Sequence, residues 1–203
     1  MRHLILVKHS LPEVDPAAPA AEWRLGGEGR RRCEPLAQQL GRYRTGSVVA
    51  SVEPKAVETG EIVARRLGVG FATGPGLHEH ERRSVGFVGA GAFEAAVERF
   101  FARPDDLVFG EETARQARDR FGAAIARVLA GHPGGDVVVV AHGTVISLFV
   151  AHRTGVDAFD LWRRLGLPSF VVLALPGFGL VTTVETMEPS IGTELATNPR
   201  RTR

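Results

Sequence analysis

Disulfide bonds, membrane spans and a strong charge of either sign are all missing from this sequence. Cys33 is the only cysteine, so no disulfide can join two parts of the chain. Lysine and arginine total 25 against 23 aspartate and glutamate, and this net charge of +2 gives no reason to expect a nucleic-acid partner. No apolar run approaches the roughly 18 residues of a membrane helix. The chain also runs from Met1 almost directly into a strand-like segment, without a signal-peptide pattern. We therefore expect a cytoplasmic protein without a membrane partner.

Two short apolar segments end in the same way, with a histidine. Residues 4–7 are followed by Lys8-His9-Ser10, and residues 137–140 are followed by Ala141-His142-Gly143-Thr144. Uninterrupted apolar runs of this length are typical of strands buried on both faces of a parallel sheet. Ligands of such sheets bind beyond the carboxyl ends of the strands. If the two strands are neighbours, both histidines therefore face one crevice, where one ring could attack a phosphoryl group and the other could hydrogen-bond its oxygens.

Strand and helix patterns alternate through most of the chain. This alternation predicts an α/β fold, a three-layer α/β/α sandwich with a mostly parallel sheet and an antiparallel edge strand. We expect one domain over residues 1–187 and a disordered tail over residues 188–203, which are polar and lack a period. The expected strands cover residues 4–7, 47–51, 69–73, 136–140, 170–174 and 179–186.

The expected helices cover residues 28–40, 53–67, 92–101, 113–130 and 144–151. Pro35 predicts a kink or a late start in the first of them, because proline removes a backbone donor and clashes with the preceding turn. Thr113-x-x-Gln116 resembles a capping box at the start of the long fourth helix.

Five motifs, taken in chain order, resemble those of one known family. They are Lys8-His9-Ser10, the stretch from Ser51 to Thr59 with Lys55-Ala56 inside it, Leu77-His78-Glu79, Glu112-Thr113 and Ala141-His142-Gly143. Together they resemble the histidine phosphatase superfamily, the phosphoglycerate-mutase-like enzymes, over roughly residues 3–186. That family has Arg-His-Gly in place of Lys8-His9-Ser10 and arginine in place of Lys55, so the chain resembles a divergent member.

The resemblance implies a histidine acid-type phosphatase that hydrolyses a small phosphorylated metabolite without metal or cofactor. His9 is then the nucleophile that becomes phosphohistidine, and His142 donates hydrogen bonds to the phosphoryl oxygens. Glu79 is the implied proton donor, with Glu81 in reserve, and a carboxyl group can fill this role if burial raises its pKa. The residues expected to bind phosphate are Lys8, Lys55, Ser10 and Gly143.

Three other interpretations stay open from the sequence. Lysines in place of both arginines could leave a phosphate-ligand binder or scaffold that does not turn over, and a phosphoglycerate-type mutase is a further alternative. The alternation His78-Glu79-His80-Glu81 also suggests a metal site, although alternate residues of an extended segment face opposite ways, so it offers two ligands at most. Nothing in the sequence fixes the oligomeric state, for which a homodimer is one possibility.

Overall fold

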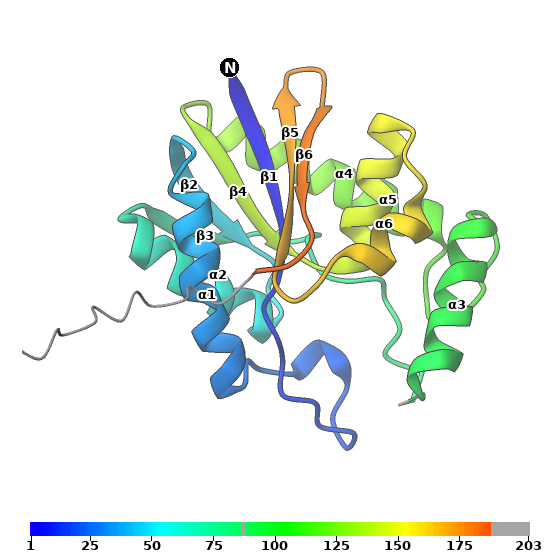
Figure 1. Cartoon of the computed structure of the whole chain (residues 1–203). Helices are drawn as coiled ribbons and strands as arrows, with labels where there is room; N and C mark the ends of the chain where they lie inside the picture. The colour runs from blue at the N-terminus through cyan, green and yellow to red at the C-terminus, as the bar shows by residue number, and fades with distance from the viewer. Residues whose placement is uncertain (87, 188–203) are drawn as a thin grey trace, which may run out of the picture.

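A computed structural model describes residues 1–86 and 88–187 of the chain (Figure 1); the predicted tail, residues 188–203, lies outside the described residues. The strands are β1 (Arg2–Lys8), β2 (Thr45–Ala50), β3 (Gly70–Thr73), β4 (Asp136–Ala141), β5 (Ser169–Leu175) and β6 (Gly179–Val184). The helices are α1 (Gly27–Leu40), α2 (Pro54–Leu67), α3 (Ala90–Ala102), α4 (Ala114–Gly131), α5 (Gly143–Thr154) and α6 (Ala158–Arg164), with a short 3-10 helix η1 (Ala20–Glu22).

The six strands form one sheet in the order β3-β2-β4-β1-β5-β6. β1, β2, β3 and β4 pair in parallel, whereas β5 is antiparallel to both of its neighbours, β1 and β6. The predicted fold class is confirmed. The antiparallel strand lies one place inside the edge rather than at it, because the short turn after β5 adds β6 beside it.

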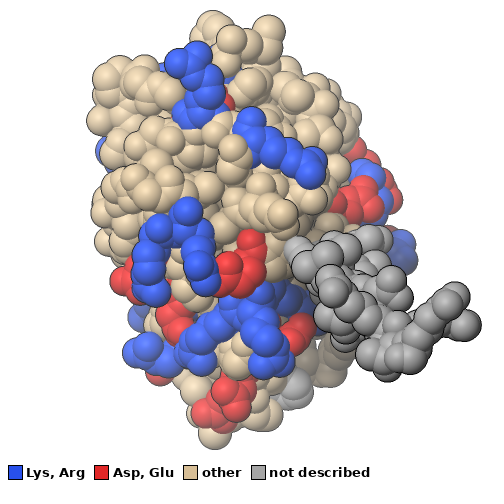
Figure 2. Space-filling view, turned by 60° about the vertical axis from the view of Figure 1, so that its left-hand side comes forward, with Lys and Arg blue, Asp and Glu red and all other residues tan. Residues whose placement is uncertain are grey.

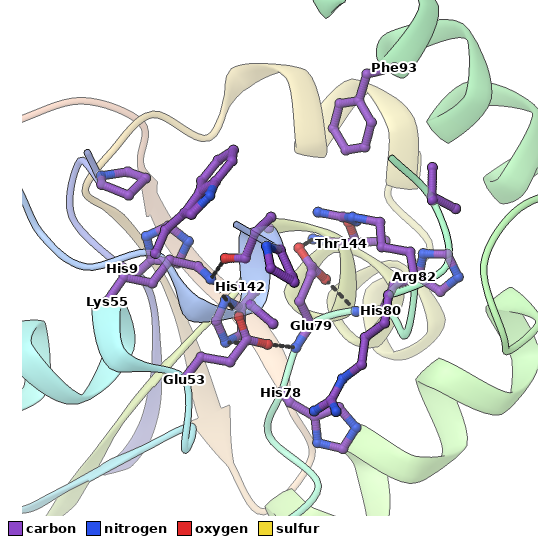
Figure 3. Close-up of a pocket in the computed structure, with 18 of the residues that line it drawn as sticks. His9, Glu53, Lys55, His78, Glu79, His80, Arg82, Phe93, His142 and Thr144 are labelled. Carbon is purple, nitrogen blue, oxygen red and sulfur yellow. Dashed lines mark hydrogen bonds and ion pairs between the residues drawn. The ribbon is translucent and has the colours of Figure 1, made fainter. Parts of the chain in front are cut away.

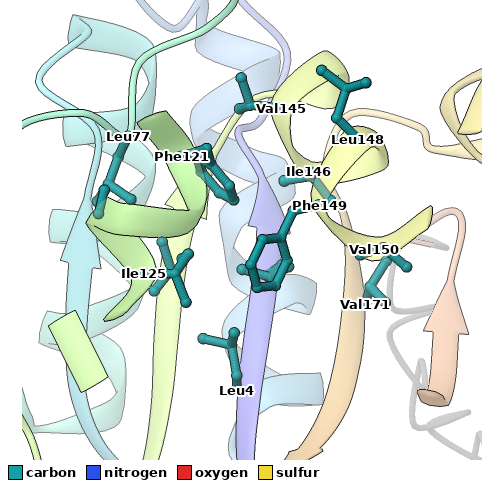
Figure 4. Close-up of a cluster of buried hydrophobic side chains, with 14 of the residues drawn as sticks. Leu4, Leu77, Phe121, Ile125, Val145, Ile146, Leu148, Phe149, Val150 and Val171 are labelled. Carbon is teal, nitrogen blue, oxygen red and sulfur yellow. The ribbon is translucent and has the colours of Figure 1, made fainter. Parts of the chain in front are cut away.

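The two faces of β1 bury alternate residues under different helices. Leu4 and Leu6 belong to a cluster of apolar side chains under α4 and α5, which Figure 4 shows. Ile5 and Val7 belong to a second cluster under α1 and α2. All four side chains are fully buried, at about 2 kcal/mol of stabilisation each, so β1 and its neighbour β4 are held from both sides. This fixes the place where both strands end.

Two local features differ from the sequence-based expectation. α1 begins at Gly27 and continues through Pro35, so the late start was wrong. α6 was not expected at all. It has only seven residues, and its sequence signal is Asp157, whose side chain accepts a hydrogen bond from the Asp160 amide as an N-cap.

The capping box at the start of α4 is confirmed. The Gln116 amide donates to Thr113 Oγ1 at 3.2 Å, and the Thr113 amide donates to Gln116 Oε1 at 2.8 Å. Both bonds satisfy amides that the first helical turn leaves unpaired. The cap fixes where α4 begins, and α4 carries an arginine that contacts the site.

Basic and acidic side chains alternate on the face shown in Figure 2. Arg31 and Arg32 of α1 are paired with Glu28, and Arg30 is paired with Glu58 of α2. These arginines are thus part of an ion-paired helix surface. Among residues 1–86 and 88–187, no helix is long and apolar enough to cross a membrane.

Candidate active site

The histidines that follow β1 and β4 lie side by side. Because β1 and β4 are parallel neighbours with Lys8 opposite Ala141, the next residues, His9 and His142, leave the sheet at the same edge. Their ring centroids are 5.1 Å apart, and both rings are at least nine-tenths buried. Both line a cavity of about 720 Å³ that lies beyond the carboxyl ends of the strands (Figure 3). The two histidines therefore lie in one cavity, as the sequence predicts.

His9 is held as a neutral ring with one nitrogen available. Its Nδ1 lies 2.7 Å from the backbone carbonyl oxygen of Ser10. A carbonyl can only accept, so Nδ1 carries the hydrogen and Nε2 keeps its lone pair. Burial, followed by the nearby charges of His142 and Lys55, holds the pKa of His9 well below its ordinary value. A neutral imidazole with a free Nε2 is suited to nucleophilic attack.

His142 occupies the N-cap position of α5, fully buried. Its Nε2 hydrogen-bonds with the Ser51 hydroxyl at 2.9 Å and lies 3.5 Å from Glu53 Oε1. Its Nδ1 is buried and finds no hydrogen-bond partner among the described residues, and the same is true of the hydroxyl of Thr144, the second residue of the helix. Buried polar atoms are normally paired, so these two atoms mark a place for a polar ligand.

The two lysines lie beside the histidines, and Lys55 is buried while Lys8 is partly buried. Lys8 Nζ donates to the Leu165 carbonyl at 2.6 Å. Burial lowers the pKa of Lys8 to about 8, partly opposed by the charge of Glu79. Gly143 permits this position, since a Cβ there would lie 3.2 Å from Lys8 Cε. Lys55 Nζ donates to the Ala20 carbonyl at 2.7 Å, which connects α2 to the loop over the cavity.

Glu79 reaches the same cavity from the loop between β3 and α3. Its carboxylate accepts hydrogen bonds from the amides of His80, at 2.9 Å, and Thr144, at 3.2 Å. Burial by itself would raise the pKa of Glu79, but the charges of Arg82 and His142 and these two amides outweigh it and lower the pKa to about 2. Burial does not raise the pKa of Glu79 here, because the cations and amides around the carboxylate, which sequence alone does not show, stabilise its ionised form.

Arg120 of α4 fixes the loop that carries Glu79. Its guanidinium donates to the backbone carbonyls of Gly76, His78 and Glu79 at 2.9 to 3.0 Å. It also donates to Glu112 Oε1 at 2.5 Å, and that carboxylate oxygen accepts from the Glu81 amide. The Glu112-Thr113 motif thus contributes by holding the loop of Glu79 in place.

The family model for the histidine phosphatase superfamily (branch 1) matches residues 16–177. The chain belongs to the histidine phosphatase superfamily. The match begins after Lys8-His9-Ser10, so the divergent opening motif lies outside it. No curated protein matches the chain.

Solved structures of similar fold include several phosphatases. Phosphoserine phosphatase from Entamoeba histolytica, in complex with 3-phosphoglyceric acid, has a TM-score of 0.72 at 15% identity and covers 92% of this chain and 98% of its own. Bacillus stearothermophilus YhfR has a TM-score of 0.70 at 18% identity, with 91% and 96% covered. The mycobacterial glucosyl-3-phosphoglycerate phosphatase has a TM-score of 0.66 at 21% identity, with 84% and 89% covered. At these identities the likeness concerns the fold.

Within this histidine phosphatase fold, Ser10 is not brought to the cavity. Its hydroxyl donates to the Gly29 carbonyl at 2.7 Å, and its amide donates to Thr59 Oγ1 at 3.0 Å. The single hydroxyl hydrogen is therefore used to tie the end of β1 to α1. Ser10 has a structural position, and its predicted contact with phosphate finds no support in this geometry.

Glu53 is a site residue that the sequence analysis did not single out. It precedes α2, and its carboxylate lies between two cavity residues, accepting from Lys55 Nζ at 2.5 Å and from the Glu79 amide at 2.8 Å. With His142 also 3.5 Å away, Glu53 joins three parts of the site. In the sequence Glu53 is marked only as an acidic residue two positions before Lys55. An acidic residue there is equally typical of an ordinary helix start.

Arg82 is a second site residue that the sequence analysis did not assign. It lines the cavity, its guanidinium carbon lies 4.8 Å from the centroid of the Phe93 ring, and its buried Nη1 makes no hydrogen bond to the described residues. Arg82 therefore adds a guanidinium group to the cavity wall, besides the two lysines.

The histidines of the Glu79 loop do not converge on a metal position. His78 Nε2 pairs with Glu81 Oε1 at 3.1 Å, while the His80 ring packs against Phe100 and hydrogen-bonds the Glu112 carbonyl. Within residues 1–86 and 88–187, no group of three or more His, Cys, Asp or Glu side chains is arranged to hold a metal ion.

Proposed function

We propose that this protein is a phosphomonoesterase that acts through a phosphohistidine at His9. The observation that carries the proposal is the neutral His9 ring. Its Nδ1 donates to the Ser10 carbonyl, which leaves Nε2 free, and its ring centroid lies 5.1 Å from that of His142. Membership of the superfamily and the phosphatases among the structural neighbours support phosphoryl chemistry.

The first step forms a bond between His9 Nε2 and phosphorus and breaks the bond from phosphorus to the leaving oxygen. The phosphoryl oxygens then accept hydrogen bonds from Lys8, from Lys55 and from His142, in the tautomer whose Nδ1 carries the hydrogen. The amino end of α5, which begins at Gly143, adds partial positive charge. In a water-poor cavity these fixed charges stabilise the transition state more strongly than they would in water.

Glu79 gives its proton to the leaving oxygen. This carboxyl group is ionised before substrate binds, since its pKa is lowered to about 2. A bound phosphate dianion is a like charge and shifts that pKa upward, so Glu79 takes up a proton together with the substrate. It then removes a proton from the water that cleaves the phosphohistidine. Glu81 pairs with His78 and is the less suitable acid.

The proposal is tested with a generic aryl phosphate and the purified protein. We expect phosphate release that a chelator does not reduce and that His9→Ala abolishes. Full activity in His9→Ala would overturn the mechanism, and strict dependence on a divalent ion would replace it with metal chemistry.

A binder of phosphate ligands is the second candidate, and Glu53 is the observation that favours it. This carboxylate already pairs with Lys55 and so reduces the positive charge available to a substrate dianion. Binding of inorganic phosphate without turnover of any phosphate ester would select this candidate.

A further inference from the structure

The cavity is much larger than a phosphoryl group needs. Its volume of about 720 Å³ falls in the range of pockets that enclose whole small molecules. The polar residues of the reaction occupy one side, and the Glu79 loop adds Arg82. The rest of the wall comes from the loop of residues 12–23, from the start of α3 and from α6. That wall therefore contacts the leaving group rather than the phosphoryl group.

Three aromatic rings form the main surfaces of this wall. They are Trp23 in the loop before α1, Phe93 in α3 and Trp162 in α6, and each is only half-buried. Phe93 and Trp162 lie 6.0 Å apart between centroids, and Trp162 stacks on Phe159 at 6.0 Å and 12°. Figure 3 shows Phe93 across the cavity from Glu53 and Lys55. The rings are thus held by contacts behind them and face the cavity.

The polar atom of Trp23 is not available to a ligand. Its indole N–H donates to the carbonyls of Asp15, at 2.9 Å, and Ala18, at 3.1 Å. Val52, Val85 and Leu167 add further apolar surface. A leaving group rich in hydroxyl or amino groups would lose its hydrogen bonds to water against this wall, which disfavours its binding. An apolar group gains from covering it.

We propose that the substrate is a phosphate monoester of a bulky, largely apolar alcohol whose carbon skeleton lies between Trp23, Phe93 and Trp162. The phosphoryl group occupies the histidine side, and the ester oxygen lies near Glu79. This inference rests on the proposed function for turnover, but its preference for apolar ligands is measurable by binding alone.

The test uses primary alkyl phosphates, whose leaving oxygens have similar basicity. Affinities of ethyl, butyl, hexyl and 4-phenylbutyl phosphate are measured by tryptophan fluorescence, since both tryptophans of the chain line the cavity. His9→Ala is used so that the ligands are not consumed, and turnover by the unaltered protein is measured in parallel. Each buried methylene strengthens binding by up to about fourfold. The four methylenes that separate hexyl from ethyl phosphate can therefore lower Kd by up to about 250-fold, and we expect a fall of more than about 30-fold.

Variants of the wall give the matched comparison. Phe93→Ala and Trp162→Ala should each reduce the preference for hexyl over ethyl phosphate by about tenfold. Phe178→Ala, which removes an aromatic ring between β5 and β6 outside the cavity wall, should keep it. Thermal unfolding shows which variants are folded, and either wall variant suffices.

Two results would overturn the inference. One is an affinity independent of chain length, and the other is tighter binding of phosphoserine than of hexyl phosphate. A preference for long chains without hydrolysis of any ester would leave the ligand class standing and remove the phosphatase.

Discussion

Buried polar groups lie at both ends of β4, and the Asp136 carboxylate at the amino end is fully paired, whereas His142 at the carboxyl end is not. At the amino end, the Asp136 carboxylate accepts from the His3 amide at 2.7 Å, from the His3 ring at 3.1 Å and from the Arg44 amide at 3.0 Å. At the carboxyl end, Nδ1 of His142 and the Thr144 hydroxyl have no partner among the described residues. A buried carboxylate whose two oxygens both accept hydrogen bonds stabilises the fold, whereas the unpaired atoms of His142 and Thr144 line the cavity and are available to a ligand.

The largest expected effect is a contrast between the two ends: substitution at one end changes turnover, and substitution at the other changes the free energy of unfolding. His9→Ala should reduce turnover to background, because the nucleophile is lost, while the free energy of unfolding changes by no more than about 1 kcal/mol. Asp136→Ala should keep the turnover of folded molecules but lower the free energy of unfolding by about 1–3 kcal/mol, because buried donors lose their acceptor. Turnover and urea unfolding of both variants check this. Similar effects of the two variants on both quantities would remove the distinction between the ends.

The next effect concerns the acid. Glu79→Gln keeps the size and loses the proton, and we expect kcat to fall by about 10²- to 10⁴-fold for alkyl phosphates. For aryl phosphates the loss should be small, because their leaving groups depart without protonation. An equal loss for both classes would move the role to Glu81, which Glu81→Gln tests as the matched control.

A pH effect of about tenfold per unit is expected on the alkaline side. Lys8 contributes its charge below its pKa of about 8 and loses it as the pH rises through that value. Phosphate binding, measured as kcat/KM with a dianionic substrate, should therefore fall above about pH 8. Lys8→Arg should move this fall to higher pH, since guanidinium keeps its proton. An unchanged alkaline limb in that variant would place Lys8 outside the reaction.

The smallest effect is the coupling between the two lysines. Arginine offers a planar fork and lysine a point charge, so Lys8→Arg and Lys55→Arg should change orientation more than attraction. If both contact one phosphoryl group, the double variant should depart from additivity in kcat/KM by at least about 0.5 kcal/mol. Strict additivity would mean that Lys55 does not contact the phosphoryl group and keeps its two contacts to Glu53 and the Ala20 carbonyl.

The fold and the meeting of the histidines could be predicted because both follow from local patterns. An apolar run such as residues 4–7 specifies a buried strand, and parallel neighbours bring their carboxyl ends together. Glu79 was named through the family resemblance of Leu77-His78-Glu79, and it lies in the cavity wall two residues after Leu77, which is buried in the core.

The missed features depend on contacts between distant segments. Glu53 lies two residues from Lys55, but its role follows from contacts with His142 and the Glu79 amide, which come from other loops. The Ser10 hydroxyl was expected in the cavity and instead contacts Gly29, because α1 passes close to the end of β1. The lowered pKa of Glu79 could not be predicted, because the sequence does not show that Arg82 lies near this carboxylate.

The most direct test of the account is to trap the covalent intermediate. The protein is mixed with a phosphate ester, quenched in alkali within milliseconds, where phosphohistidine survives, and digested for mass spectrometry. We predict an acid-labile phosphoryl group on the peptide that contains His9, present in Glu79→Gln and absent in His9→Ala. Hydrolysis at an undiminished rate with no phosphoryl group on His9, or with the group on another residue, would contradict the account.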